Sequence, residues 1–342
     1  MSLAKFDPNA PADPNAGIYG LPHTLEQSKV VLIPVPFEVT TSYGGGTSMG
    51  PMAIRSASAQ VDLYDGETGK PYSSGIFMME QAPKIVSSNK SARVRAKRVI
   101  NGTVDENHDL GKDLERVNAA CEQMNEIVQE TTTALLQKHK LVGVIGGDHS
   151  VAFGSIEAHA KRYHKIGVLH VDAHADLREA YEGFVWSHAS VMYNVLHRIA
   201  DVRKLVQVGI RDFCEQEKRE AEKWGRRVTM LRLSSSGSWQ HLCQRLIEDL
   251  PEQVYISFDI DGLEPSLCPH TGTPVPGGLT WREAEELLSI VAENRAIVGF
   301  DLCEVAPGKS DEWDANVGAR MLYKLIGYTL LSRHKHGSSL PR

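Results

Sequence analysis

Six short, uninterrupted apolar runs constrain the fold of this chain more than any other feature of its sequence. They lie at residues 30–34, 141–145, 166–170, 205–208, 254–258 and 296–300. Runs without polar alternation are typical of strands buried on both faces of a sheet. Longer stretches separate them, and the clearest helical stripe comprises Leu114, Val117, Cys121, Met124, Val128 and Leu135. Repeated strand–helix–strand units predict an α/β fold, a single three-layer αβα domain with a mostly parallel sheet.

Segments outside this rhythm suggest how the 342 residues are organised. Residues 1–28 are rich in Pro, Asn, Asp and Gly without periodicity, which indicates an N-terminal surface arm. We place the main domain at residues 29–332 and a C-terminal tail at 333–342. Within the domain, residues 83–106 carry six Lys and Arg side chains, and we interpret this segment as a basic loop or insertion without a function of its own.

Composition and charge exclude several classes of protein. The net charge of -6 disfavours a nucleic-acid binder, whose surface normally carries a basic face. No stretch reaches the roughly 20 apolar residues that cross a bilayer, and the N-terminus lacks the apolar segment of a signal peptide. The five cysteines form no CxxC pair, so neither a disulfide framework nor a thiolate zinc site is indicated. We therefore expect a cytoplasmic protein with no nucleic-acid or membrane partner.

Acidic and imidazole side chains gather directly after three of the predicted strands. The carboxyl ends of parallel strands meet at one edge of a sheet, where ligands bind. On an extended backbone, alternate residues also point to the same side. The resulting candidate metal ligands are His149, Asp172, His174, Asp176, Asp259 and Asp261.

These side chains together favour a site with two metal ions. Carboxylates crowded at the ends of apolar strands are costly unless protons or cations neutralise them. Four carboxylates and two imidazoles suit ions such as Mn²⁺, and six ligands exceed one tetrahedral zinc site but fit two metals that share carboxylates. Strand-end caps or surface acids would explain any one of the three motifs, but explain all three together poorly.

The three motifs resemble the metal-binding signature of the arginase/agmatinase (ureohydrolase) family. They read Gly-Gly-Asp-His-Ser, Asp-Ala-His-Ala-Asp and Ser-Phe-Asp-Ile-Asp-Gly-Leu-Glu-Pro, and the resemblance extends to residues 50–55, 272–280 and 301–307. It covers roughly residues 30–330 and implies an arginase/deacetylase-like fold with residues 29–332 as the catalytic domain. The chain is more similar to agmatinase-like, formiminoglutamase-like and guanidine hydrolase-like members than to true arginases.

The resemblance implies two Mn²⁺ per chain, with Ni²⁺ as the alternative, bridged by a hydroxide that attacks the guanidinium carbon of a small substrate. Urea and an amine would be released. By the same resemblance, Asp172 and Asp259 bridge the metals, His149 and Asp176 complete one metal, and His174 and Asp261 complete the other. Family members assemble as trimers or hexamers, so we expect a homo-oligomer.

Three more residues receive roles from the resemblance or from their position. Asp176 would pass a proton to the departing amine. Glu304 matches the family glutamate that pairs with the guanidinium, and its alternative is a strand-end salt bridge. His188 stands where the family has a proton-shuttling histidine, although Ala189 replaces the usual glycine and a structural role is the alternative. His170 is either a core residue or one that orients a metal ligand.

The residues after Asp176 are expected to face the substrate, but they do not identify it. Arg178 either points into the cleft, where it would attract a substrate carboxylate, or pairs with Glu179 or Glu182 and gives no information about the substrate. The Asp-Leu-Arg sequence resembles the formiminoglutamase branch, and the small polar groups that hold arginine in arginases are missing. Agmatine is the default substrate. A guanidino acid, formiminoglutamate and free guanidine are the alternatives. Free guanidine is favoured if the bulky side chains of Tyr181, Phe184 and Trp186 make the pocket small.

Two functions of another class remain as alternatives. A deacetylase-like enzyme on the related fold would use a single zinc and would not need all six ligands. A non-catalytic metal-binding protein would be expected to have lost ligands, and none is missing here. The number of metals per chain separates these hypotheses from the two-metal hydrolase.

Overall fold

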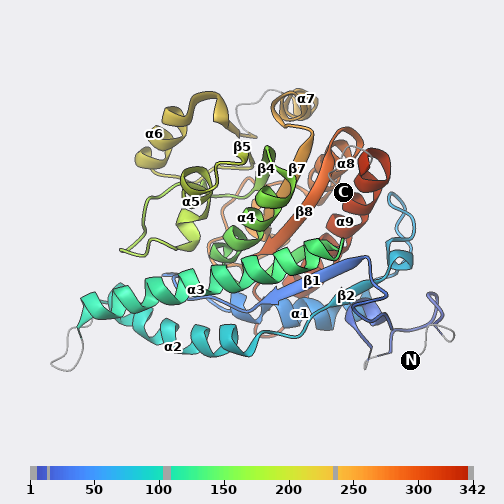
Figure 1. Cartoon of the computed structure of the whole chain (residues 1–342), viewed down its shortest axis with the longest axis horizontal. Coiled ribbons are helices and arrows are strands. Elements are labelled where there is room, and N and C mark those ends of the chain that lie inside the picture. Colours follow the sequence, from blue (N-terminus) through green and yellow to red (C-terminus); the bar gives the residue numbers. More distant parts are fainter. Residues whose placement is uncertain (1–5, 14–15, 103–108, 234–237, 338–342) are drawn as a thin grey trace.

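The computed structural model describes residues 6–13, 16–102, 109–233 and 238–337. A sheet of eight strands forms its centre (Figure 1). The strands are β1 Val30–Val35, β2 Ile76–Met78, β3 Leu141–Gly146, β4 Ile166–Val171, β5 Val202–Val208, β6 Val228–Leu231, β7 Gln253–Asp259 and β8 Ala296–Cys303. Their order is β2-β1-β3-β8-β7-β4-β5-β6, and every neighbouring pair is parallel. The predicted α/β class and parallel sheet are confirmed.

Helices cover both faces of the sheet. They are α1 Gly50–Ala57, α2 Pro83–Ile100, α3 Leu110–Gln137, α4 Ala152–Tyr163, α5 Val191–Arg198, α6 Glu215–Trp224, α7 Trp239–Asp249, α8 Trp281–Asn294 and α9 Trp313–His336. One core contains side chains of α1, α7, α8 and α9, and the other contains side chains of α2, α3, α4 and α5. Within β1, Val30 and Leu32 belong to the first core, whereas Val31 and Ile33 belong to the second. Alternate side chains of one buried strand thus fill opposite layers, which explains the continuous apolar runs.

Each of the six predicted strands is present, while the short edge strands β2 and β6 were missed. These two strands lie at the two ends of the strand order. With three and four residues, they are too short to give a recognisable apolar run. They extend the sheet without contributing to the edge where the acidic motifs meet.

Of the two interpretations of residues 83–106, a basic loop or an insertion, the loop is wrong over Pro83–Ile100, which forms helix α2 beside α3 (Figure 1). Its buried stripe consists largely of small side chains, including Ala92 and Ala96, so it carried little hydrophobic signal. Hydrogen bonds from Arg98 and Arg95 hold the pKa of Asp113 on α3 at about 2, despite its burial. Residues 103–106 lie outside the described residues.

The predicted surface arm is also wrong in part, because residues 18–21 are packed into the core. Ile18, Tyr19 and Leu21 are buried. The Tyr19 hydroxyl donates a hydrogen bond of 2.9 Å to the carbonyl of Ala319 on α9, and its ring lies 4.8 Å from that of Tyr323. Residues 1–5 and 14–15 lie outside the described residues.

The predicted C-terminal tail begins too early, since α9 continues to His336. Its last turn contains Arg333, His334, Lys335 and His336, and such cations interact favourably with the carbonyl end of a helix. Residues 338–342 lie outside the described residues. Among the described residues, we find no helix with both the length and the apolar content to cross a membrane.

The sheet order explains how the acidic motifs meet. β3, β8, β7 and β4 are consecutive neighbours, so the segments that follow them emerge side by side at one edge. After β3 the chain passes very close to the segment that follows β1: a Cβ on Gly147 would lie 2.1 Å from the carbonyl oxygen of Phe37. Only glycine allows this approach, which directs the next residues towards the site.

We predict that the arm contributes measurably to stability through Tyr19. Tyr19→Ala should lower the free energy of unfolding by about 3 kcal/mol, as expected when a buried aromatic side chain is truncated. Tyr19→Phe, which keeps the ring and removes only the hydrogen bond to Ala319, should cost about 1 kcal/mol. Urea denaturation followed by circular dichroism measures both. Equal stability of Tyr19→Ala and the wild-type protein would show that the arm is not part of the core.

Candidate metal centre

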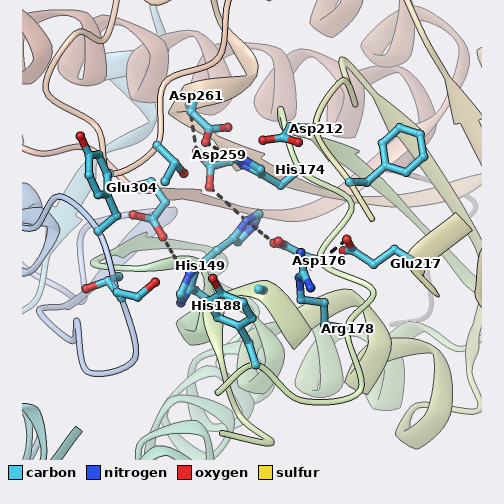
Figure 2. Close-up of a pocket in the computed structure, with 18 residues that line it drawn as sticks. His149, His174, Asp176, Arg178, His188, Asp212, Glu217, Asp259, Asp261 and Glu304 are labelled. Carbon is cyan, nitrogen blue, oxygen red and sulfur yellow. Dashed lines mark hydrogen bonds and ion pairs between the residues drawn. The ribbon is translucent and has the colours of Figure 1, made fainter. Parts of the chain in front are cut away.

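The six predicted ligands lie together at the carboxyl edge of the sheet, in two groups that share one aspartate. In the first group, Nδ1 of His149 lies 3.0 Å from Oδ2 of Asp172, 3.3 Å from Oδ2 of Asp176 and 3.3 Å from Oδ2 of Asp259. One imidazole nitrogen and three carboxylate oxygens therefore converge, as metal ligands would. Figure 2 shows the His149 ring directed towards Asp176 and Asp259.

The second group surrounds the ring of His174. Its Nδ1 lies 3.0 Å from Oδ2 of Asp261 and 3.5 Å from Oδ1 of Asp172. Asp172 thus directs Oδ2 towards the first group and Oδ1 towards the second. A carboxylate between two groups of ligands is the arrangement that two metal ions can share.

Backbone groups fix the orientation of these carboxylates. Asp172 accepts a hydrogen bond from the backbone N–H of His174, Asp261 from that of Ala173, and Asp259 from that of Asp261. Asp176 has a φ of 54°, a left-handed conformation that costs free energy in a residue other than glycine. Such strain is typical of positions whose side-chain direction is set by function.

Buried partners orient the ligands from behind. Nε2 of His149 lies 2.8 Å from the hydroxyl of Ser257, which in turn donates to Asp301. This hydrogen bond leaves Nδ1 of His149 directed at the carboxylates.

His170 orients a ligand rather than being only a core residue. Nε2 of Gln207 lies 2.9 Å from Nδ1 of His170 and donates to the carbonyl of Ala175. Since an amide nitrogen is a donor, Nδ1 of His170 accepts and Nε2 carries the proton. Nε2 of His170 then donates to Oδ2 of Asp172 over 2.8 Å. One of the two hypotheses for His170 is therefore supported by its contacts.

The electrostatics of the cluster call for cations. Burial, followed by the charge of Asp172, raises the pKa of Asp176 to about 6, and burial with the charges of Asp261 and Asp172 raises the pKa of Asp259. Although burial works against it, hydrogen bonds with Asp172 and Asp261 raise the pKa of His174 to about 12. Without metals, protons must neutralise the site. Oxygen and imidazole donors without a thiolate fit divalent ions of intermediate hardness.

A cavity of about 220 Å³ opens onto the two groups. Glu304 and His188 also line it, so the structure brings these predicted residues to the same site (Figure 2). Oε1 of Glu304 accepts a hydrogen bond of 3.0 Å from the backbone N–H of His149. Burial, together with the charges of Asp259 and Asp148, raises the pKa of Glu304. A cationic ligand would relieve this charge.

His188 lies in the cavity wall beside Thr40. Its Nδ1 is 3.1 Å from the hydroxyl of Thr40, and its backbone N–H donates to the same oxygen. Burial, followed by the positive charges of His174 and His149, lowers the pKa of His188 to about 3. The side chain is therefore a neutral imidazole, with one ring nitrogen that donates a hydrogen bond and one that accepts.

Arg178 faces the cavity and is paired at the same time. It lines the cavity, but its Nε lies 3.7 Å from Oε2 of Glu217, and its guanidinium lies 4.9 Å from the centre of the Tyr181 ring. The expected partners Glu179 and Glu182 are not the ones observed. Both alternatives for Arg178 are therefore met in part, with a partner that belongs to α6.

The sequence model of the arginase family matches residues 28–327. The chain belongs to the arginase family. It is 33% identical to the N(1)-aminopropylagmatine ureohydrolase of Thermus thermophilus, over 88% of this chain and 90% of that protein. It is 30% identical to the agmatinase of Bacillus cereus, over 83% and 86%. The agmatine ureohydrolase of Thermoplasma volcanium shares the fold, with a TM-score of 0.71 at 24% identity, over 97% and 98%.

Membership of the arginase family fixes the class of reaction. The chain is an amidinohydrolase, a hydrolase of C–N bonds in linear amidines, and the family depends on a binuclear metal centre. The buried His and Asp side chains at the sheet edge of this arginase-family enzyme agree with that dependence.

Sequence reasoning missed part of the cavity lining. Asp212 follows β5 and lines the cavity. Glu217, the third residue of α6, also lines it and accepts a hydrogen bond from the backbone N–H of Leu177. Asp212 comes four residues after the end of the predicted strand 205–208, and this position was a signal for it, whereas Glu217 gave none. Of the aromatic residues considered, only Tyr181 lines the cavity, because Phe184 and Trp186 are buried in the core.

We expect Asp172→Asn to disrupt both groups of ligands in this arginase-family enzyme. Metal content after reconstitution should fall from about two ions per chain to fewer than about one, because a neutral amide replaces the carboxylate that both groups share. Metal analysis and the metal-dependent shift in melting temperature measure the effect. His270→Gln, in a separate His–Asp cluster with Asp311 and Asp314, is the control and should retain both ions. Two ions bound to Asp172→Asn would contradict the shared-ligand assignment.

Proposed function

We propose that this enzyme hydrolyses a small guanidino compound at a centre of two Mn²⁺ ions, releasing urea and an amine. One observation carries the proposal. Asp172 lies between His149 and His174 and directs one oxygen to each. His149, Asp176 and Asp259 would complete one ion with Asp172, and His174 and Asp261 the other, with Asp259 as the second bridge. Ni²⁺ is the alternative, because imidazole and carboxylate donors accept it as well.

When bound, two divalent cations lower the pKa of a shared water, so that a nucleophile is available near neutral pH. The chain's own residues would orient the substrate. Glu304, with Oε1 held by the N–H of His149, would accept guanidinium N–H groups at its remaining lone pairs and keep the planar carbon facing the metal ligands. Its burial strengthens this charge-assisted hydrogen bond.

Proton transfer would use Asp176 and His188. Asp176, which lines the cavity, would take up the proton that the attacking water releases and pass it to the departing amine nitrogen, because a neutral amine leaves more readily than its anion. His188, neutral and held by Thr40, would relay protons between this nitrogen and the cavity mouth. Both side chains line the same cavity (Figure 2).

Agmatine is the substrate that the outer cavity favours. Glu217 offsets the charge of Arg178, and Asp212 adds a further negative charge to the lining. A net negative mouth attracts the distal ammonium of agmatine and disfavours a carboxylate. The names of the relatives support the same class, including the longer aminopropylagmatine. A guanidino acid is the second candidate, because Arg178 does line the cavity.

The first test is urea release by enzyme reconstituted separately with Mn²⁺ and Ni²⁺. The substrates are agmatine, aminopropylagmatine, 4-guanidinobutyrate, 3-guanidinopropionate, arginine and free guanidine, with ammonia and formamide followed for formiminoglutamate. Glu304→Gln should lower kcat/KM for the active substrate on the order of 100-fold, since a hydrogen bond to a charged group contributes about 1.5–3 kcal/mol. The metal content should not change. Full activity of Glu304→Gln would remove it from the guanidinium site.

Arg178→Gln separates the two substrate classes. If agmatine is the substrate, kcat/KM should stay within about threefold of wild type, because a charge that is already paired near the surface contributes little. Turnover of 4-guanidinobutyrate that disappears in Arg178→Gln would instead establish Arg178 as the reader of a carboxylate. Steady-state kinetics with both substrates distinguishes these outcomes.

The expected homo-oligomer, a trimer or hexamer, and the cytoplasmic location remain predictions.

A further inference from the structure

Helix α2 contains a cation, Arg93, that contacts the segment after β1 rather than the neighbouring helix α3. Nη1 of Arg93 donates hydrogen bonds to the carbonyls of Val39, at 2.9 Å, and Thr41. Its Nη2 lies 3.8 Å from Oε1 of Glu38. By contrast, Arg95 on the same helix pairs with Asp113 of α3. Arg93 is therefore bound to residues 38–48, which we call the pocket loop.

Glu38 fixes the far side of the pocket loop. Its Oε2 accepts hydrogen bonds from the backbone N–H groups of Gly46, at 2.9 Å, and Ser48, at 3.0 Å. Its own N–H donates to Asn89 of α2 over 2.8 Å. The buried carboxylate of Glu38, 6% exposed, thus joins both ends of the loop to each other and to α2.

The pocket loop forms one wall of the cavity and contacts residues of the site. Thr41, Ser42 and Tyr43 line the cavity. Thr40 holds His188, and the N–H of Val39 donates to Asp148, the residue before His149. The carbonyls that Arg93 binds flank Thr40 directly. A displacement of the loop would therefore reach the substrate wall and His188 together.

Residues 42–45 of the pocket loop are exposed and have little packing of their own, although Val39, Thr40 and Thr41 are buried. Gly44, Gly45 and Gly46 all have positive φ, at 65°, 131° and 110°, and glycine has the widest backbone freedom of any residue. Tyr43 is 74% exposed, so its own packing does not hold the loop. The hydrogen bonds to Glu38 and Arg93 supply the order that the sequence of the loop lacks.

We propose that Arg93 is a positioning residue for the substrate wall: together with Glu38 it holds the pocket loop in the geometry that binds the guanidino substrate. The basic helix α2, for which the sequence patterns indicated no function, thereby supports the active site from outside. The kinetic consequence rests on the proposed function, whereas the anchoring of the loop does not. A guanidinium suits this role because one planar group binds two carbonyls and a carboxylate at once.

The test compares Arg93→Gln with Arg95→Gln, which loses an ion pair on the same helix without touching the loop. In the Mn²⁺-loaded enzyme, Arg93→Gln should increase amide hydrogen exchange at residues 44–48 by roughly tenfold or more, because the loop opens more readily. It should lower kcat/KM for agmatine roughly 10- to 100-fold with unchanged metal content, as a small misplacement of binding groups can. Arg95→Gln should match wild type in both measurements.

Arg93→Lys guards against a purely structural effect. Its ammonium keeps the charge beside Glu38 and reaches a carbonyl, so it should recover part of both the exchange protection and the activity. Equal exchange and equal kcat/KM in Arg93→Gln and Arg95→Gln would overturn the proposal, as would a loosened loop with unchanged kcat/KM. If wild-type enzyme leaves agmatine intact, the substrate assignment fails separately, and the exchange at residues 44–48 still decides whether Arg93 anchors the loop.

Discussion

Buried carboxylates repel one another at one edge of the sheet, and this repulsion governs both the stability and the chemistry of the site. Asp172, Asp176, Asp259 and Asp261 end or follow two strands of an apolar sheet, where water is largely excluded. Such a cluster is stable only when cations or protons share it. In the function that we propose, two divalent ions would provide that charge and at the same time activate water for hydrolysis. The stability of the site and its chemistry thus have the same physical origin.

The surrounding structure keeps these ligands in one arrangement. Backbone N–H groups donate hydrogen bonds to the carboxylates. Ser257 orients the candidate ligand His149, and His170 orients Asp172. The left-handed backbone at Asp176 and at Glu304, with φ of 62°, costs free energy that the rest of the fold must offset. Preorganised groups need little rearrangement during the reaction, so the strained backbone at these two residues favours catalysis although it lowers stability.

The cavity beyond the metal ligands comes from several distant segments. The pocket loop, α6 and the segment after Asp176 each contribute one wall. Arg178 shows the consequence: Glu217, distant in sequence, offsets a charge that in isolation would favour a carboxylate substrate. Charge in this cavity is therefore a property of the assembled walls and not of any one motif.

The sequence by itself determined the parallel α/β fold, the family and the six candidate ligands, since buried strands and strand-end acids leave local patterns of period and spacing. The sequence patterns did not predict α2, because small residues such as Ala92 and Ala96 form its buried stripe. They did not predict the burial of Tyr19 either, because its hydrogen bond to Ala319 joins residues 300 apart in the chain. The partner of Arg178 and the anchor of the pocket loop became visible only in the folded chain. Those depend on which side chains approach from other elements, a proximity that no local pattern in the chain records.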